Sequence, residues 1–311
     1  MPFLRALSKI GADQRQMLSC VHELSDDDLL HDLRSFEIVI DKTELNEICK
    51  RVFSVEELSA SLIGERTAQR IEQADRDCIR LCLTELWSRW CADKPCVELL
   101  ELSIRRGYDQ LQPQDSADAC RTWLDAWNIA LALFDKAKIK SMAKFDKRFR
   151  TSPSLSDWVQ DLDFYLLRAG HENNDFLRFR ISLCEEMLKK LQFNRSGRNQ
   201  DDTTGNWKKA LAQSYFLVGE TDTTDSLYAG WLEKDPLWGE GWIGWSDCYF
   251  FNDCNSTYLS RSEEILLHGF SFKGVRGLMD LLIRLTLTFE KQGKNEKALM
   301  LQKIISRKAS T

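Results

Sequence analysis

Four of the ten cysteines lie close together in the sequence, at Cys78, Cys82, Cys91 and Cys96. Thiolates are common zinc ligands, and Cys78 and Cys82 are one helical turn apart, so both could reach one ion. Zinc sites more often use C-x2-C pairs on loops, however, and the helical pattern continues between Cys82 and Cys91. We therefore expect reduced cysteines that pack as small apolar side chains, with no bound metal. A zinc site at these four residues is the alternative.

The segment 239–244 (GEGWIG) matches the G-x-G-x-x-G pattern of dinucleotide-binding loops. Such a loop follows a β-strand and opens a helix whose N-terminus holds the pyrophosphate. Here the preceding residues, 231–236, are typical of a helix end and a turn. We expect these glycines to permit tight helix entry and close packing, and we expect no cofactor.

Other residue types that support catalysis are scattered along the chain. Ser141 and Lys144 have the spacing of a Ser–Lys nucleophile pair, but no accompanying motif of such enzymes is found. The histidines occupy no recognisable acid–base or ligand spacing; they are His22, His31, His171 and His268. We predict that the protein is not an enzyme, unless folding assembles a polar cluster that the sequence does not reveal.

The composition is typical of a folded protein with long helices. Of 311 residues, 43% are hydrophobic and 29% charged, and prolines number only 5. A net charge of -5 argues against a nucleic-acid-binding face. No apolar run approaches the ~20 residues of a membrane span, and no signal peptide is recognised, so we expect a soluble, cytoplasmic protein. The basic stretch 136–150 is either a solvated helix face or a docking patch for an acidic partner.

Residues 1–95 are expected to form a helical N-terminal region. Ser25, followed by three aspartates, indicates a helix start, and Ser54 with Glu57 has the spacing of a capping box. The clearest helix is predicted for 65–91, where apolar residues recur at a period of 3.6. The segment 36–40 resembles a strand, but a lone strand would have no partner, so we interpret it as helix or linker.

Residues 96–311 contain a repeating pattern of paired helices. Its clearest copy runs from Trp207 to Pro236. The aromatic residue Tyr215 recurs 34 residues later as Tyr249 and a further 40 residues on as Phe289, with extra residues at 252–258 accounting for the longer step. Each aromatic follows a small residue by three positions; these residues are Ala212, Ser246 and Thr286. Because a single helical hairpin cannot bury its apolar face alone, stacking would place the aromatics in a continuous core.

Two weaker copies precede these three. The first is marked by the spacing of Gly107, Ala119, Trp123 and Ala126, with a break at 112–114. The second comprises Trp158, Leu162 and Tyr165, ends at Gly170 and pairs with a helix at 175–191. Together the pattern predicts about five helical hairpins.

The small residue, the aromatic, the closing proline and the 34-residue period resemble the tetratricopeptide (TPR) repeat. The segment 206–251, with GWIGWSDCY at 241–249, is also similar to the TPR-like region of bacterial SEC-C motif-associated proteins, as are 156–162 and 119–127. The chain lacks the Cys-rich tail of that group, so the metal binding of the tail is not expected. The resemblance implies an all-α fold, an α-solenoid of TPR-like hairpins that a helical N-terminal region precedes.

The resemblance also implies a function, that of a protein- or peptide-binding scaffold or adaptor. In TPR proteins the first helix of each hairpin lines a concave groove, and the matching positions here are Lys209, Gln213, Phe216, Asp247, Phe250 and Asp280. This mixture of polar, acidic and aromatic groups suits an amphipathic peptide. Lys209 matches a position of the TPR carboxylate clamp, but Gln213, Gly244 and Asp280 depart from it. The alternative is a sensor of the stress-response or phage-defence type, in which the N-terminal helices act as effector.

Overall fold

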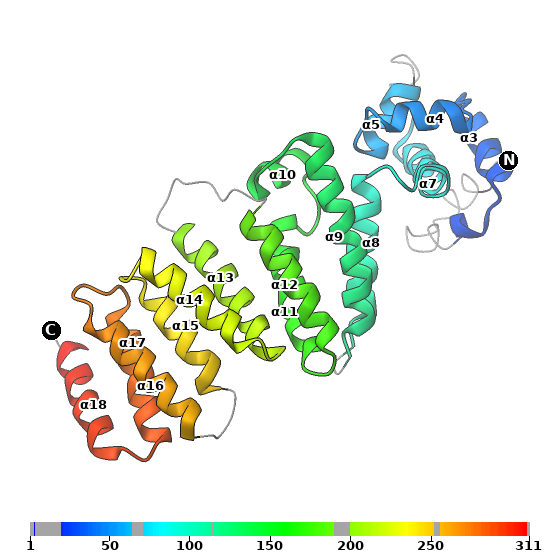
Figure 1. Ribbon diagram of the computed structural model, residues 1–311. Coiled ribbons are helices and arrows are strands. Elements are labelled where there is room, and N and C mark those ends of the chain that lie inside the picture. The colour runs from blue at the N-terminus through cyan, green and yellow to red at the C-terminus, as the bar shows by residue number, and fades with distance from the viewer. Residues whose placement is uncertain are drawn as a thin grey trace. The chain divides into compact units, whose positions relative to one another are not determined.

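The computed structural model describes residue 3 and residues 20–63, 71–112, 115–189, 200–251 and 256–309. Within these ranges every regular element is an α-helix, so the predicted all-α class is confirmed. The chain divides into two compact units, 1–162 and 163–311, which are described separately below (Figure 1). The division falls inside one helix, and the predicted boundary at residues 95/96 stays a prediction.

The first unit contains seven complete helices among its described residues and the beginning of an eighth. They are α3 (Asp26–Arg34), α4 (Lys42–Cys49), α5 (Val55–Leu62), α7 (Gln73–Trp90), α8 (Val97–Gln110), α9 (Ala117–Ala137), α10 (Met142–Phe149) and the start of α11 (Leu155–Gly170). The second unit holds the rest of α11, then α12 (Asn174–Lys189), α13 (Gln200–Leu217), α14 (Thr221–Lys234), α15 (Gly239–Phe250), α16 (Ser256–Ser271), α17 (Leu278–Lys291) and α18 (Asn295–Ala309).

The helix starts that the sequence indicates in the N-terminal region are confirmed. Ser25 caps α3 in a complete capping box with Asp28. The Ser54 side chain accepts a hydrogen bond from the Glu57 backbone N–H at the start of α5. The helix predicted for 65–91 is α7, which begins only at Gln73, while residues 64–70 lie outside the described part of the chain.

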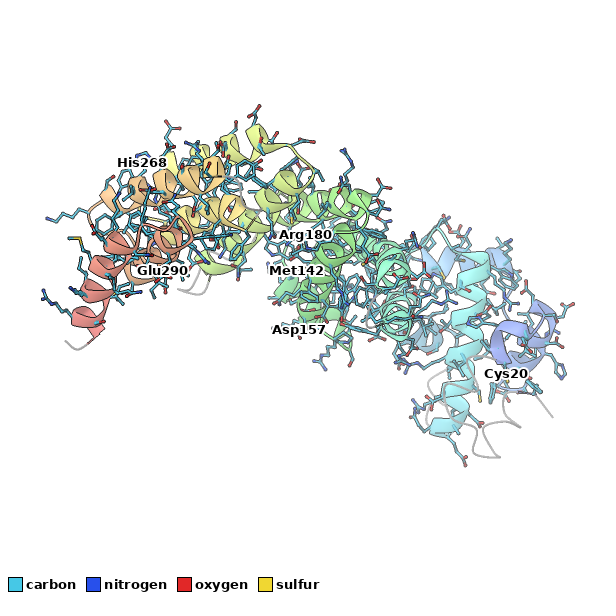
Figure 2. All side chains as sticks on the ribbon, turned by 90° about the horizontal axis from the view of Figure 1, so that it is seen from below. Cys20, Met142, Asp157, Arg180, His268 and Glu290 are labelled. Atoms are coloured by element: carbon cyan, nitrogen blue, oxygen red, sulfur yellow. The ribbon has the colours of Figure 1, made fainter. Side chains whose placement is uncertain are left out.

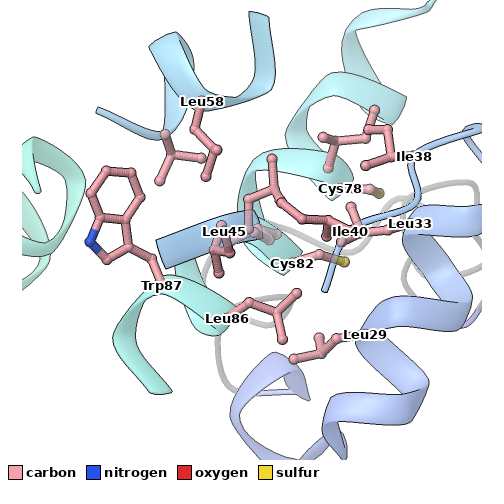
Figure 3. Packing of buried hydrophobic residues seen from close by; sticks show 14 of the residues in the cluster. Leu29, Leu33, Ile38, Ile40, Leu45, Leu58, Cys78, Cys82, Leu86 and Trp87 are labelled. Carbon is pink, nitrogen blue, oxygen red and sulfur yellow. The ribbon is translucent and has the colours of Figure 1, made fainter. Parts of the chain in front are cut away.

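Helix α7 is the central element of the N-terminal core, because α3, α4 and α5 all pack against it. Its buried face includes Cys78, Cys82, Leu86 and Trp87 (Figure 3). The segment 36–40 is a linker, as one of the two interpretations held: it buries Phe36, Ile38 and Ile40 in the core and exposes the residues between them. This alternation explains its strand-like pattern.

The hairpin of α8 and α9 depends on a glycine at its crossing point. A Cβ atom at Gly107 would lie 2.1 Å from Nε1 of Trp123, so no larger residue fits there without displacing the indole. The same indole N–H donates a hydrogen bond of 2.9 Å to the Ile104 carbonyl. The predicted spacing of Gly107 and Trp123 thus corresponds to a direct contact between the two helices.

In the second unit, consecutive helices form pairs that follow one another (Figure 1). Each of α13, α15 and α17 contacts the helix that follows it, and α15 also contacts both α13 and α17. In each of these three hairpins the two helices meet at small residues. The Thr224 hydroxyl donates to the Ala212 carbonyl (3.0 Å), and Ser246 and Ser262 hydrogen-bond side chain to side chain (2.7 Å). At the equivalent positions of α17 and α18, Thr286 and Ala298 are both buried.

The hairpins are also joined by acidic side chains on their second helices. Glu185 on α12 accepts a hydrogen bond from the Tyr215 hydroxyl of α13 (3.1 Å). Asp225 on α14 accepts one from Tyr249 of α15 (2.8 Å). The third aromatic is Phe289, which has no hydroxyl, and there Glu263 on α16 pairs instead with Lys294 at the start of α18. The three aromatics therefore occupy comparable surroundings, as the repeat predicts.

Arg180 is the most deeply buried cation among the described residues of the second unit, and its side chain connects three helices (Figure 2). It forms a two-pronged ion pair with Asp163 on α11 (2.8 and 3.1 Å). It also donates to the side chains of Gln213 (3.0 Å) and Ser214 (3.1 Å) on α13. The buried charge is thus fully compensated only when α11, α12 and α13 are packed together.

Substituting Arg180→Ala is expected to lower the free energy of unfolding by about 3–5 kcal/mol, because the Asp163 carboxylate would lose its partner in the packed interior. Urea unfolding followed by tryptophan fluorescence measures the loss. The matched control is Arg178→Ala, an exposed arginine on the same helix, for which a change within about 0.5 kcal/mol is expected. Equal losses in the two variants would contradict the structural role of Arg180.

Candidate functional site

The six predicted binding residues all lie on α13, α15 and α17, the first helices of three neighbouring hairpins. With the spacings of 34 and 40 residues they fall into equivalent sets, one member from each helix. The sets are Lys209, Ile243 and Ile283; Gln213, Asp247 and Leu287; and Phe216, Phe250 and Glu290. We call the surface formed by these three sets, with Glu240 and Asp280 one helical turn before them, the first-helix face.

Lys209 at one end of the first-helix face is held by an ion pair across two helices. Its ammonium group lies 2.8 Å from the Glu240 carboxylate of α15. The stem of Lys209 crosses α15 at Gly244, where an added Cβ would lie 3.0 Å from the lysine Cγ and Cδ atoms. Gly244, which the TPR carboxylate clamp does not have, therefore provides the space for this lysine.

Asp247 lies in the middle of the face, between Lys209 and Arg284. Its carboxylate forms an ion pair with Arg284 of α17 (2.7 Å). Burial raises the pKa of Asp247 to about 6, and the opposing effects of Arg284 and Lys209 only partly offset this rise. The α15–α17 contact thus includes a carboxyl group that is difficult to ionise.

Two further predicted residues differ in their surroundings. The side chain of Gln213 accepts a hydrogen bond from the buried Arg180 (3.0 Å), so its position is fixed by the core of the unit. Asp280 is exposed in the first turn of α17. Only Asp280 of these two is accessible without rearrangement.

The expected exposure of Phe216 and Phe250 is wrong, because both side chains are buried. Phe216 packs edge-on against Tyr249 and Tyr258, with ring centroids 5.0 and 6.0 Å apart. Phe250 lies beneath the guanidinium of Arg284, whose Cζ atom is 5.2 Å from the ring centroid. Stacking of the next hairpin covers both rings, an effect that a single repeat copy does not reveal.

The structure instead exposes two aliphatic side chains that the sequence reasoning missed. Ile283 and Leu287 lie one helical turn apart on α17, and both are exposed. Arg284, between them in sequence, also lies over the exposed ring of Phe251, with its Cζ atom 5.1 Å from the centroid. The signal was available, since the same spacings that relate Lys209 to Gln213 relate Ile283 to Leu287.

The glycines of the G-x-G-x-x-G segment have structural roles at the start of α15. A Cβ at Gly239 would lie 1.8 Å from the Arg276 carbonyl oxygen, and one at Gly241 would lie 2.2 Å from the Trp238 ring. Helix α14 and a turn precede the segment, in place of the strand that a dinucleotide site requires. The space in front of these glycines is filled by the protein itself.

The four clustered cysteines are buried, but they do not converge on one point. Cys78 and Cys82 lie near Asp32, Cys91 is hydrogen-bonded to Cys49, and Cys96 donates to Glu98 (3.2 Å). Burial raises the pKa of Cys82, Cys91 and Cys96, which disfavours the thiolate forms that bind metals. Among the described residues, no group of three or more His, Cys, Asp or Glu side chains is arranged to hold a metal ion.

The other catalytic candidates are engaged in the fold. Ser141 is buried at the start of α10, whereas Lys144 is exposed, so the two do not form a nucleophile pair. His22 forms a contact of 2.6 Å with Glu85, a carboxylate that also pairs with Arg89. His268 stacks against the ring of Trp242.

The basic stretch 136–150 contributes partly to the N-terminal core and only partly to the surface. Lys136 donates to the Cys49 carbonyl (2.8 Å) and also to the Val52 carbonyl. Arg148 lies over the ring of Phe53, with its Cζ atom 4.6 Å from the centroid. Lys144 and Lys147 are exposed, so the docking-patch alternative retains only part of its charge.

Comparison of this chain with protein-family models, with curated proteins and with solved structures yields no match. Within the described residues no helix has the length and apolar character needed to cross a membrane.

The raised pKa of Asp247 predicts a pH-dependent contribution to stability. The ordinary pKa of an aspartate is 3.8, so the folded state binds this proton more tightly than the unfolded chain does. The contribution of Asp247 to the free energy of unfolding is therefore largest below pH ~4 and falls until about pH 6, by at most about 3 kcal/mol. Urea unfolding of wild type and Asp247→Asn across this range measures it as the difference between the two proteins.

Relative to Asp247→Asn, the wild type should lose stability as the pH rises from 4 to 6 and show no further change above that range. The variant serves as its own control for all other titrating groups, because they are common to both proteins. A difference that is constant with pH would show that Asp247 titrates normally.

Proposed function

We propose that this protein is a non-enzymatic adaptor, a stack of TPR-like helical hairpins whose first-helix face binds a protein or peptide segment. The hairpins of α13 to α18 provide the support for the TPR-like assignment. Each pairs its helices at small residues, and α15 contacts both neighbouring first helices. In such a stack the first helices lie next to each other and present a common surface.

The observation that carries the proposal is the exposed aliphatic pair Ile283 and Leu287 beside the ion pair of Arg284 and Asp247. Aliphatic groups one turn apart, flanked by fixed charges, fit the apolar side of an amphipathic helix, whose polar side would face water or the flanking charges. The charged residues of the face are already paired within the protein, as Lys209 is with Glu240. They therefore orient a ligand rather than supply most of its binding energy.

The paired charges also support the non-enzymatic assignment. A general acid, base or nucleophile must be free to exchange protons or bonds with a substrate. On the first-helix face Lys209, Asp247 and Arg284 are instead held by one another or by Glu240. A soluble, cytoplasmic adaptor that needs no cofactor is consistent with these contacts and with the acidic net charge.

A second candidate function is a sensor whose N-terminal helices act as effector. One observation favours it: α3, α4, α5 and α7 share a core cluster that runs from Val21 to Cys96 and draws its fully buried side chains from that region. A region with its own core can respond or act as a separate unit. In this version the first-helix face is the sensing surface.

The adaptor proposal is tested by selecting peptides that bind the full chain from a displayed library of amphipathic helices and measuring affinity by calorimetry. Replacing Ile283 and Leu287 together by Asp should weaken the selected peptides roughly 100-fold, because two buried aliphatic side chains contribute about 3 kcal/mol. Circular dichroism of the variant verifies that it is folded.

The matched control replaces Leu267 and Phe270 by Asp, since these residues of α16 are exposed to a similar degree but lie on a second helix. Affinity should remain within about threefold of wild type in this control. Peptides that bind both double variants as well as the wild type would place the binding surface elsewhere and overturn the proposal.

A further inference from the structure

The side of α18 that faces away from its partner helix is unusually apolar. Leu299, Met300 and Ile304 are 55%, 67% and 44% exposed, respectively. The opposite side of the helix carries Ala298 and Leu301, which pack in the core with α17. The three exposed side chains lie within two turns of each other and form one continuous strip, which we call the α18 strip.

The equivalent positions on the other second helices are not apolar. Counted from the small residue at each hairpin crossing, Leu299 corresponds to Asp225 and Glu263, the two acids that the following hairpin engages. Met300 corresponds to Ser226 and Glu264, and Ile304 corresponds to Gly230 and His268. The apolar character of the α18 strip is therefore specific to this helix.

Charged residues border the α18 strip in a polarised order. Glu296 lies on the same side one turn before Met300, while Lys303 and Arg307 follow on that side toward the C-terminal end. All three are exposed. The helix thus presents an acid, then an apolar centre, then two bases.

We propose that the α18 strip is the interface with a second copy of this chain, in which two α18 helices pack antiparallel about a two-fold axis. With the axis level with the midpoint between Met300 and Lys303, Leu299 lies opposite Ile304 of the partner subunit. Glu296 then lies opposite Arg307 of the partner subunit, and the symmetry forms this pair twice. An acid–apolar–base order on one helix is complementary to itself only in this antiparallel arrangement, and this complementarity identifies a second copy as the occupant.

Sedimentation equilibrium of the full chain tests the interface, from roughly 1 µM to roughly 1 mM, where a small apolar interface associates. The wild type should shift from monomer to dimer over this range. Glu296→Arg and Arg307→Glu should each raise the dimer dissociation constant at least tenfold, because each turns both ion pairs into like-charge contacts. The double variant Glu296→Arg/Arg307→Glu should return to within about threefold of wild type, since it restores both pairs with reversed polarity.

Ile304→Glu should also abolish the dimer, because it opposes a charge to Leu299 of the partner subunit. The matched control is Leu267→Glu on α16, an exposed leucine outside the α18 strip, which should dimerise as the wild type does. A wild type that remains monomeric at every concentration, or a double charge reversal that stays as weak as its single variants, would overturn the proposal.

Discussion

The close approach of two helices within each hairpin is the constraint on which the second unit depends. At the crossing points the side chains are limited to Ala, Ser and Thr, and two of the three crossings are closed by a hydrogen bond. Because the helices approach so closely, the large residues between hairpins, such as Trp245 and Phe289, are left to fill the space toward the next pair. A larger residue at a crossing would separate the helices and misplace those aromatics.

Buried polar contacts then connect one pair to the next. Asp225 receives both the Trp245 indole N–H (2.6 Å) and the Tyr249 hydroxyl, two groups of the following first helix. Arg180 has the same role between α11, α12 and α13, where it satisfies an acid, an amide and a hydroxyl together. Such contacts tolerate little variation in register, since a slip of one residue would leave a buried charge without its partner. The first-helix face and the α18 strip are both surfaces that this fixed register presents.

The sequence predicted the parts of the fold that depend on local pattern. The spacing of Tyr215, Tyr249 and Phe289 placed these aromatics correctly, and the serines at positions 25 and 54 marked helix starts that the structure confirms. The repeat pattern did not indicate which replaced positions would still work. Thr224, which departs from the usual small residue, fits because its hydroxyl donates to the Ala212 carbonyl.

The candidate site was less predictable, because it depends on contacts between hairpins. Phe216 and Phe250 were expected to be exposed, but Tyr249 and Arg284 of the following helices cover them. The strand-like alternation at 36–40 has a similar cause, since a linker that crosses a core buries every second residue as an edge strand does. Local periodicity specifies which side of a segment is apolar, whereas the covering element comes from elsewhere in the chain.

The hairpin crossing is tested most directly by a cross-link between Ser246 and Ser262, whose hydroxyl oxygens lie 2.7 Å apart. In a Cys248→Ala background, Ser246→Cys combined with Ser262→Cys should form an intrachain disulfide with oxidised glutathione, because the two side chains point at each other across the closest approach of α15 and α16. Mass spectrometry of the digested native protein should identify the peptide that joins positions 246 and 262. The same background with Ser246→Cys and Ser260→Cys should give none, since Ser260 is exposed. Absence of the 246–262 link, or equal linking to position 260, would contradict the register on which the stacked hairpins depend.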